Sequence, residues 1–177
     1  MSKIKYTFHY WFSGILIGLQ LLMFTGCTNS EALSTIEYNN EIVSILNATS
    51  AAIEDSTVIY DKDIPNIVTD QSTINTVELE KQLAEAKDQL SGAKTVMTFK
   101  SRNEAQQAQT TNQFENYFEL ANKYLATYEA MVTYYKENQF KDDLDTVAVY
   151  DKDLHNQYNE FIESNNELVD VLNEFVK

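Results

Sequence analysis

Glycine and proline are almost absent from this chain after residue 26. Residues 27–177 contain one glycine, Gly92, and one proline, Pro65. A β-sheet domain of this length needs many tight turns, and turns recruit glycine and proline because these residues adopt turn backbone angles at low cost. Their scarcity therefore predicts long helices joined by few connections. The length that remains after residue 26 fits one domain.

Apolar residues recur at steps of three and four, which is the spacing of one face of an α-helix. The first such pattern ends before Pro65, and Ser30 is a candidate N-cap for it. Residues 61–74 are polar and predict a connection. The apolar positions of this first predicted helix are Leu33, Ile36, Val43, Leu46, Ile53 and Tyr60.

A second pattern follows Asn75 and Glu78, a pair that resembles a capping box. Residues 101–113 are rich in Gln, Thr and Asn and contain no strong helix breaker, so they are interpreted as either a loop or a helical bridge. The apolar positions of the second pattern are Leu79, Leu83, Ala86, Leu90, Ala93 and Met97.

Two further patterns fill the C-terminal half. Tyrosines are prominent in the first of them, and we expect their rings to pack in the core with hydroxyls reaching water, in preference to forming a sugar- or peptide-binding stripe. Asp151 and Asn165 interrupt the second with polar side chains. The members are Phe114, Tyr117, Ala121, Tyr124, Tyr128, Met131 and Tyr135, and then Leu144, Val147, Leu154, Tyr158, Phe161, Leu168, Leu172 and Phe175.

These patterns together predict an all-α fold, an antiparallel helical bundle of three to four long helices over residues 33–177. Four is the natural number, and three long helices remain an alternative if 101–113 is helical. The predicted core includes Leu83, Leu90, Tyr124, Met131, Leu154, Phe161 and Leu168.

The N-terminus has the three parts of a secretion signal. Lys3 and Lys5 precede an apolar stretch, and small residues precede Cys27. The run that ends in Gly26 and Cys27 resembles a lipobox, the site at which a bacterial lipoprotein is cleaved and acylated. We therefore expect residues 1–26 to be a lipoprotein signal peptide, cleaved between Gly26 and Cys27.

Cys27 is the only cysteine, so no disulfide within the chain can form. We expect its thiol to carry a diacylglyceryl group, because two acyl chains anchor a protein stably where one does not. Residues 27–32 would then be a short tether. A secreted protein with a stray thiol and an uncleaved N-terminal anchor are the alternatives.

The chain after the signal is strongly acidic. The whole chain has a net charge of −14, and without Lys3 and Lys5 the remainder has −16. Nucleic acid is therefore not expected as a partner, because its phosphates require Lys and Arg. Direct docking on anionic lipid headgroups is also not expected, and the lipid on Cys27 would provide the membrane attachment.

One segment resembles a known family. Residues 134–143 read YYKENQFKDD, followed by Leu154, His155 and Phe161, and Tyr38 and Asn39 stand near the start of the first predicted helix. This is similar to the YiiG-like family of bacterial lipoproteins. The resemblance implies an all-α lipoprotein domain. The family has no characterised function, so no catalytic residue is implied.

A search for chemistry finds few candidates. His155 is the only histidine after the signal, and Asp151 lies one helical turn before it, which predicts an ion pair more readily than a catalytic pair. The phrase YDKD occurs at residues 60–63 and 150–153, but neither copy continues as a calcium loop. Motifs for nucleotides and for nucleophile elbows are absent. We expect no metal site, no cofactor and no catalytic residue.

The best candidate for a binding surface is the junction before the last predicted helix. Tyr134, Phe140 and Lys141 stand there beside Asp142 and Asp143. Rings and charges at the end of a rigid helix can anchor and steer a partner. The alternative is that Phe140 closes the end of the bundle and the aspartates cap the next helix.

These observations predict a lipid-anchored protein of the cell membrane or outer membrane, facing away from the cytoplasm. We expect a non-catalytic binding or scaffolding module whose partner is an unidentified envelope protein or ligand. The alternatives are a carrier of a small ligand or metal ion and, with less support, an envelope hydrolase.

Overall fold

The computed structural model describes residues 32–64 and 67–176. The predicted signal peptide, Gly26, Cys27 and the candidate cap Ser30 lie outside these residues. The described part contains four long helices, and none of these helices is long and apolar enough to cross a membrane. The predicted all-α bundle is confirmed, and the number of helices is four. Their bounds are α1 Thr35–Asp63, α2 Val77–Ala93, α3 Glu104–Lys136 and α4 Asp145–Glu174.

Local caps explain where α1 and α3 begin. Ser34 and Glu37 form a capping box, in which the Ser34 hydroxyl accepts from the Glu37 amide and the Glu37 carboxylate accepts from the Ser34 amide. Asn103 caps α3 by accepting from the amides of Ala105 and Gln106. Residues 104–113 are thus the first turns of α3, which settles the ambiguity in the sequence.

The capping box predicted for α2 at Asn75 and Glu78 is wrong. The N-cap position belongs to Thr76, and Asn75 accepts a hydrogen bond from the Val77 amide instead. Glu78 is bonded to Lys81 at 2.9 Å, because the two lie one turn apart on an exposed face. The helix starts near the expected place, with different side-chain partners.

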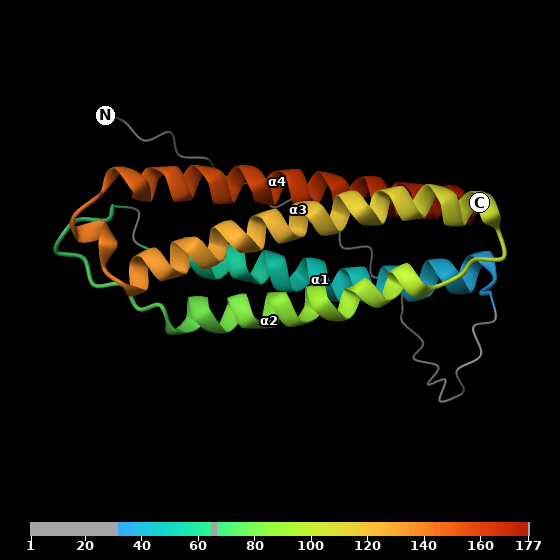
Figure 1. Ribbon diagram of the computed structural model, residues 1–177, viewed down its shortest axis with the longest axis horizontal. Coiled ribbons are helices and arrows are strands. Elements are labelled where there is room, and N and C mark those ends of the chain that lie inside the picture. Colours follow the sequence, from blue (N-terminus) through green and yellow to red (C-terminus); the bar gives the residue numbers. More distant parts are fainter. Residues whose placement is uncertain (1–31, 65–66, 177) are drawn as a thin grey trace.

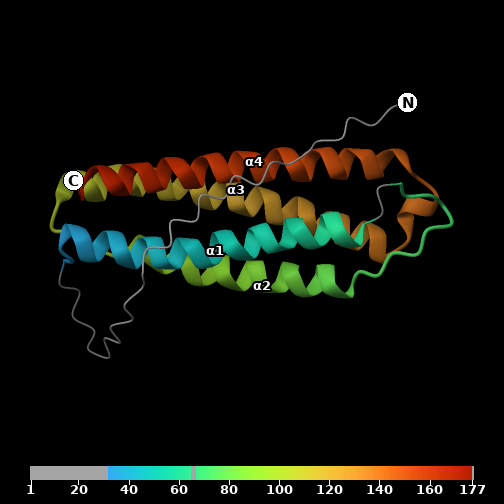
Figure 2. The same ribbon diagram turned by 180° about the vertical axis from the view of Figure 1, so that it is seen from behind.

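The helices run antiparallel in a square, and each has two neighbours. α1 lies beside α2 and α4, and α3 lies beside the same two. Figures 1 and 2 show this from opposite sides, with α3 crossing one face and α1 the other. The 3-10 helices η1, Lys94–Thr98, and η2, Gln139–Lys141, belong to the connections before α3 and α4.

Tyrosine hydroxyls cross the core between the diagonal helices α1 and α3. Tyr124 of α3 bonds Ser56 at 2.9 Å and Thr57 at 2.8 Å. Tyr38 of α1 bonds Thr110 of α3 at 2.9 Å. Burial raises the pKa of Tyr124 to about 12, so this hydroxyl keeps its proton. The expectation that the hydroxyls of the tyrosine stripe reach water is wrong for Tyr124, because its side chain is fully buried.

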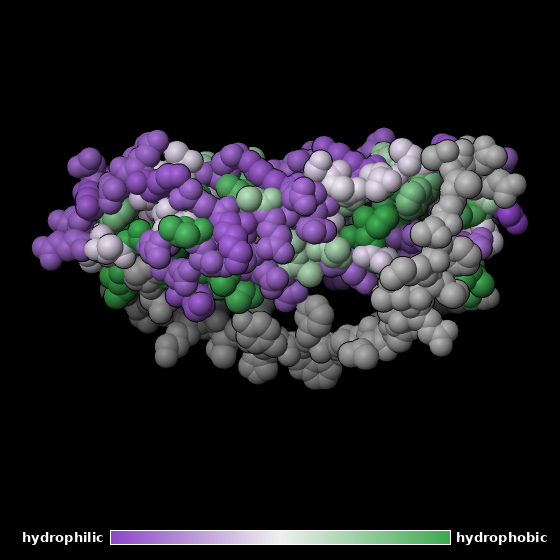
Figure 3. Space-filling view, turned by 90° about the horizontal axis from the view of Figure 1, so that it is seen from below, coloured by the Kyte–Doolittle hydropathy of each residue, from purple (hydrophilic) through white to green (hydrophobic). Residues whose placement is uncertain are grey.

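The predicted core residues are confirmed with one exception. Leu90, Tyr124, Met131, Leu154, Phe161 and Leu168 are all buried. Leu83 is only partly buried, and the fully buried residue of that stretch is Leu79, one helical turn earlier. The apolar pattern thus placed the stripe of α2 correctly, and only the burial of Leu83 is less than predicted. On the face that Figure 3 shows, the described residues are mainly hydrophilic, with small hydrophobic areas between them.

This difference predicts unequal costs for two leucine truncations. Leu168→Ala should lower the free energy of unfolding by about 2–5 kcal/mol, because it leaves a cavity in a fully buried site. Leu83→Ala should cost less than about 2 kcal/mol, because solvent already reaches that side chain. Urea denaturation of both variants checks this. Equal losses would contradict the packing of α2 described here.

Candidate functional site

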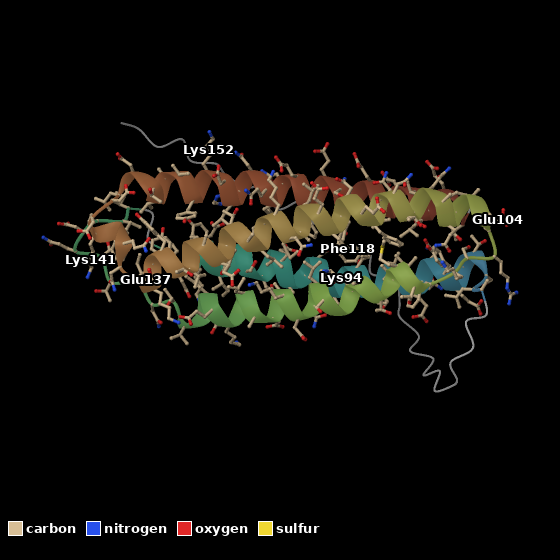
Figure 4. All side chains as sticks on the ribbon, viewed as in Figure 1. Lys94, Glu104, Phe118, Glu137, Lys141 and Lys152 are labelled. Carbon is tan, nitrogen blue, oxygen red and sulfur yellow. The ribbon has the colours of Figure 1, made fainter. Side chains whose placement is uncertain are left out.

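The junction between α3 and α4 forms one end of the bundle, and we call residues 137–145 the tip. α3 ends at Lys136, and the chain turns at Asn138, whose φ of 57° is left-handed, a conformation that asparagine tolerates better than most residues. α1 begins at the opposite end, and its 29 residues span about 43 Å. Figure 4 shows Glu137 and Lys141 at the tip and Glu104 at the other end.

The aromatic side chains of the junction point inward. Phe140 is fully buried, with its ring centroid 5.9 Å from that of Tyr135. Tyr134 is 4% exposed, and its hydroxyl donates to the carbonyl of Asp143. Phe140 therefore closes the end of the bundle, and neither ring is available to a partner in this conformation.

The charged side chains of the tip point outward. Lys141, Asp142 and Asp143 are all exposed, as are Glu137 and Asp145. The structure thus brings the five predicted residues together at one end of the bundle, with Tyr134 in the last turn of α3, and divides them into a buried aromatic pair and an exposed charged group.

Asp143 also has a structural role. Its carboxylate accepts from the Thr146 amide at 3.3 Å and from the Thr146 hydroxyl at 2.6 Å. These hydrogen bonds lower the pKa of Asp143. Asp143 thus stabilises the start of α4, as the capping alternative predicts. The side chains of Lys141 and Asp142 have no hydrogen bond or ion pair within the described residues, and Nζ of Lys141 lies 5.9 Å from the centroid of the Phe140 ring.

A second group of polar residues lies at the same end, and we call Tyr60, Asp61, Asp151 and His155 the histidine cluster. His155 of α4 bonds Asp61 of α1 through Nε2 at 3.1 Å and the carbonyl of Asp151 through Nδ1 at 2.7 Å. Tyr60 of α1 donates to the Asp151 carboxylate at 3.2 Å. The cluster therefore ties α1 to α4.

The geometry sets the protonation of His155. A carbonyl oxygen and a carboxylate can only accept hydrogen bonds, so both ring nitrogens carry protons. The hydrogen bond to Asp61 raises the pKa of His155, and the hydrogen bond to the Asp151 carbonyl raises it further. Burial lowers the pKa, but by less, so its value is about 9. His155 is therefore a cation in this arrangement, bonded to two aspartates and to no serine hydroxyl. A doubly protonated ring is an ion-pair partner and not a general base.

The two YDKD phrases meet in this cluster. Tyr60 and Asp61 come from the first phrase, and Asp151 comes from the second. Asp151 and His155 were paired by their spacing, but Asp61 was missed because its contact depends on the packing of α1 against α4. The repeated phrase was the available signal, and neither copy was interpretable as a binding motif by itself.

Two shallow grooves flank α2. One, of about 340 Å³, lies against α3 and includes Lys87, Lys94 and Asn122. The other, of about 570 Å³, lies against α1 and is lined largely by small residues such as Ser44, Ala48 and Gly92. Within residues 32–64 and 67–176, no group of three histidine, cysteine or acidic side chains is arranged to hold a metal ion.

No family model matches the chain, and neither a curated protein nor a solved structure matches it. The resemblance to the YiiG-like lipoproteins therefore stays a hypothesis that is based on the residues quoted for it.

The histidine cluster predicts a loss of stability at alkaline pH. The pKa of His155 is about 9 in the folded chain, above the ordinary histidine value of 6.5, so its contribution to stability is complete below pH 6.5 and is lost as the pH rises toward 9. The side chain is 35% exposed, so we expect solvent screening to limit the effect to about 1 kcal/mol. Urea denaturation across this range should show the loss in the natural chain and not in His155→Gln. An identical pH dependence in both proteins would refute the ion pair.

Proposed function

We propose that the protein is a lipid-anchored module of the bacterial cell envelope that acts by binding a partner at its tip. The anchor is Cys27, acylated after removal of residues 1–26, and the resemblance to YiiG-like lipoproteins agrees with that assignment. The domain carried by the anchor is the four-helix bundle.

The observation that carries this proposal is the position of the tip. The described chain enters the bundle at Thr35, the start of α1, which is eight residues after Cys27, and the exposed Lys141 and Asp142 lie at the opposite end. About 43 Å of packed helix separates the two. A rigid bundle thereby holds one charged turn at a distance from the attachment point, where a large partner has room to bind.

The charge of the surroundings indicates the chemistry of the partner. Residues 137–177 contain eleven acidic residues and three lysines. The expected partner is therefore a protein with a basic surface, or a protein that binds these acidic residues through a bridging divalent cation. Phe140 and Tyr134 support the turn from inside, and Lys141 and Asp142 contact the partner, with Asp143 holding the start of α4.

The anchor is tested by Cys27→Ser. The variant should lose the acyl group and accumulate as unprocessed precursor, because the hydroxyl of serine cannot replace the thiol that accepts the lipid. Intact mass and detergent partitioning measure both effects. Thr28→Ser, at the neighbouring residue, is the matched control and should be processed normally. A natural mature protein whose mass shows no acyl adduct would disprove the anchor.

The tip is tested by photo-crosslinking in living cells. A photoreactive amino acid in place of Asp142 should give a discrete adduct with a basic envelope protein, and the same amino acid in place of Glu104, at the other end, should not. The same amino acid in place of Glu137, the first residue of the tip, should also give the adduct. Lys141→Ala combined with Asp142→Ala should abolish the adduct formed from position 137 with little change in stability, because the only side-chain contact that this pair makes within the described residues is that of Lys141 with the Phe140 ring, at 5.9 Å.

The matched control for that pair is Lys123→Ala with Glu160→Ala. These residues form an exposed ion pair of 2.7 Å on the flank of the bundle, so the change in net charge is the same. The control should keep the adduct. Equal adducts from positions 142 and 104, or the loss of the adduct in both double variants, would disprove a specific site at the tip.

A further inference from the structure

Charge is unevenly distributed across the bundle. α4 carries eight acidic residues and one lysine. Residues 77–103, which contain α2 and η1, carry four acidic residues and five basic ones. α2 and α4 occupy diagonal corners of the square, because each is the neighbour of α1 and α3. The charge of the bundle is therefore asymmetric: the long edge formed by α4 is strongly acidic, and the diagonally opposite edge formed by residues 77–103 is not.

The least acidic part of this corner is the stretch 89–103, which we call the basic edge. It contains Lys94, Lys100 and Arg102 and no aspartate or glutamate. Among the described residues, neither Lys94 nor Lys100 has an ion-pair partner, and both are exposed. Met97 stands between them and is 39% exposed. Figure 4 places Lys94 near the middle of the bundle, with Lys152 on α4.

The segment that leads back to Cys27 is fastened to this same edge. The Leu33 amide donates to the Lys100 carbonyl at 2.7 Å, and the Arg102 amide donates to the Leu33 carbonyl at 2.8 Å. The Arg102 side chain adds a bond from Nε to the Ala32 carbonyl at 2.8 Å. Five residues, 27–31, remain between this attachment and the start of the proposed anchor, and they can span at most about 17 Å.

We infer that the basic edge faces the anionic headgroups of the membrane that holds the anchor, with the acidic α4 edge turned away. This orientation rests on the proposed acylation of Cys27, which brings the edge close to the surface. Screening limits electrostatic forces to about 8 Å at physiological salt, so the charges nearest the lipid decide the orientation. The net charge of the chain alone does not predict this contact.

Acidic residues at the anchored end favour contact along the edge and not through the end of the bundle. Glu37 and Glu104 lie in the first turns of α1 and α3, and Glu174 ends α4 there. Glu37 also lies near Arg102 and offsets part of its charge. Lys94 and Lys100 are therefore the residues that carry the attraction.

The orientation is tested on vesicles by lysine footprinting. Residues 27–177, which include the whole bundle, are coupled through Cys27, the only thiol, to a maleimide lipid. One set of vesicles is phosphatidylcholine, and the other is an equal mixture with phosphatidylglycerol. A water-soluble amine-acylating reagent should modify Lys94 and Lys100 about threefold or more slowly on the anionic vesicles, and Lys152 equally on both. The protection should disappear in about 1 M salt, where the screening length falls to about 3 Å.

Matched charge variants separate orientation from repulsion. Lys87 lines a groove together with Lys94, so in the natural chain it should share the protection on anionic vesicles. Lys94→Glu with Lys100→Glu should remove this protection of Lys87, and Lys141→Glu with Lys152→Glu, which changes the net charge equally, should retain it. Identical footprints on neutral and anionic vesicles, or protection of Lys152, would overturn the inference. Because the lipid is coupled to Cys27 chemically, the footprint tests the orientation alone. An unacylated Cys27 in cells would refute the proposed anchor, independently of the footprint.

Discussion

The register of the bundle depends on buried hydrogen bonds between helices that are not neighbours. α1 and α3 face each other diagonally, and the hydroxyls of Tyr38 and Tyr124 bridge them through Thr110, Ser56 and Thr57. A buried hydroxyl without a partner is costly, so these pairs are satisfied at one axial position of α3 against α1. Apolar stripes alone tolerate a shift by a turn, whereas these pairs do not.

Polar residues that interrupt the apolar pattern of α4 fix the register of α4 against α1 in the same way. Asp151 accepts from Tyr60, and Asn165 accepts from Ser50 at 3.0 Å. His155 adds its ion pair to Asp61 near one end. Residues that look like defects in the stripe of α4 are therefore the points at which α4 is joined to α1.

The two ends and the two charged edges of the bundle have different tasks in the proposed function. The tip is supported from inside by Phe140 and Tyr134, and its charged side chains are exposed. The basic edge is fastened to the residues that follow the proposed anchor. When the basic edge faces the membrane, the tip and the acidic α4 edge remain open to a basic partner. The two proposals therefore require no common residue.

The sequence alone determined the helical class, the approximate helix bounds and most of the core. These properties are local: scarce glycine and proline and the 3-4 spacing of apolar residues act within one helix. The same reasoning failed where two helices had to be placed together. It included the partly buried Leu83 in the core, expected the hydroxyls of the tyrosine stripe to reach water, and missed Asp61 as a partner of His155. Only the tertiary structure decided these contacts, because they depend on the axial register and rotation of α1, α3 and α4 relative to one another, which no single helix encodes.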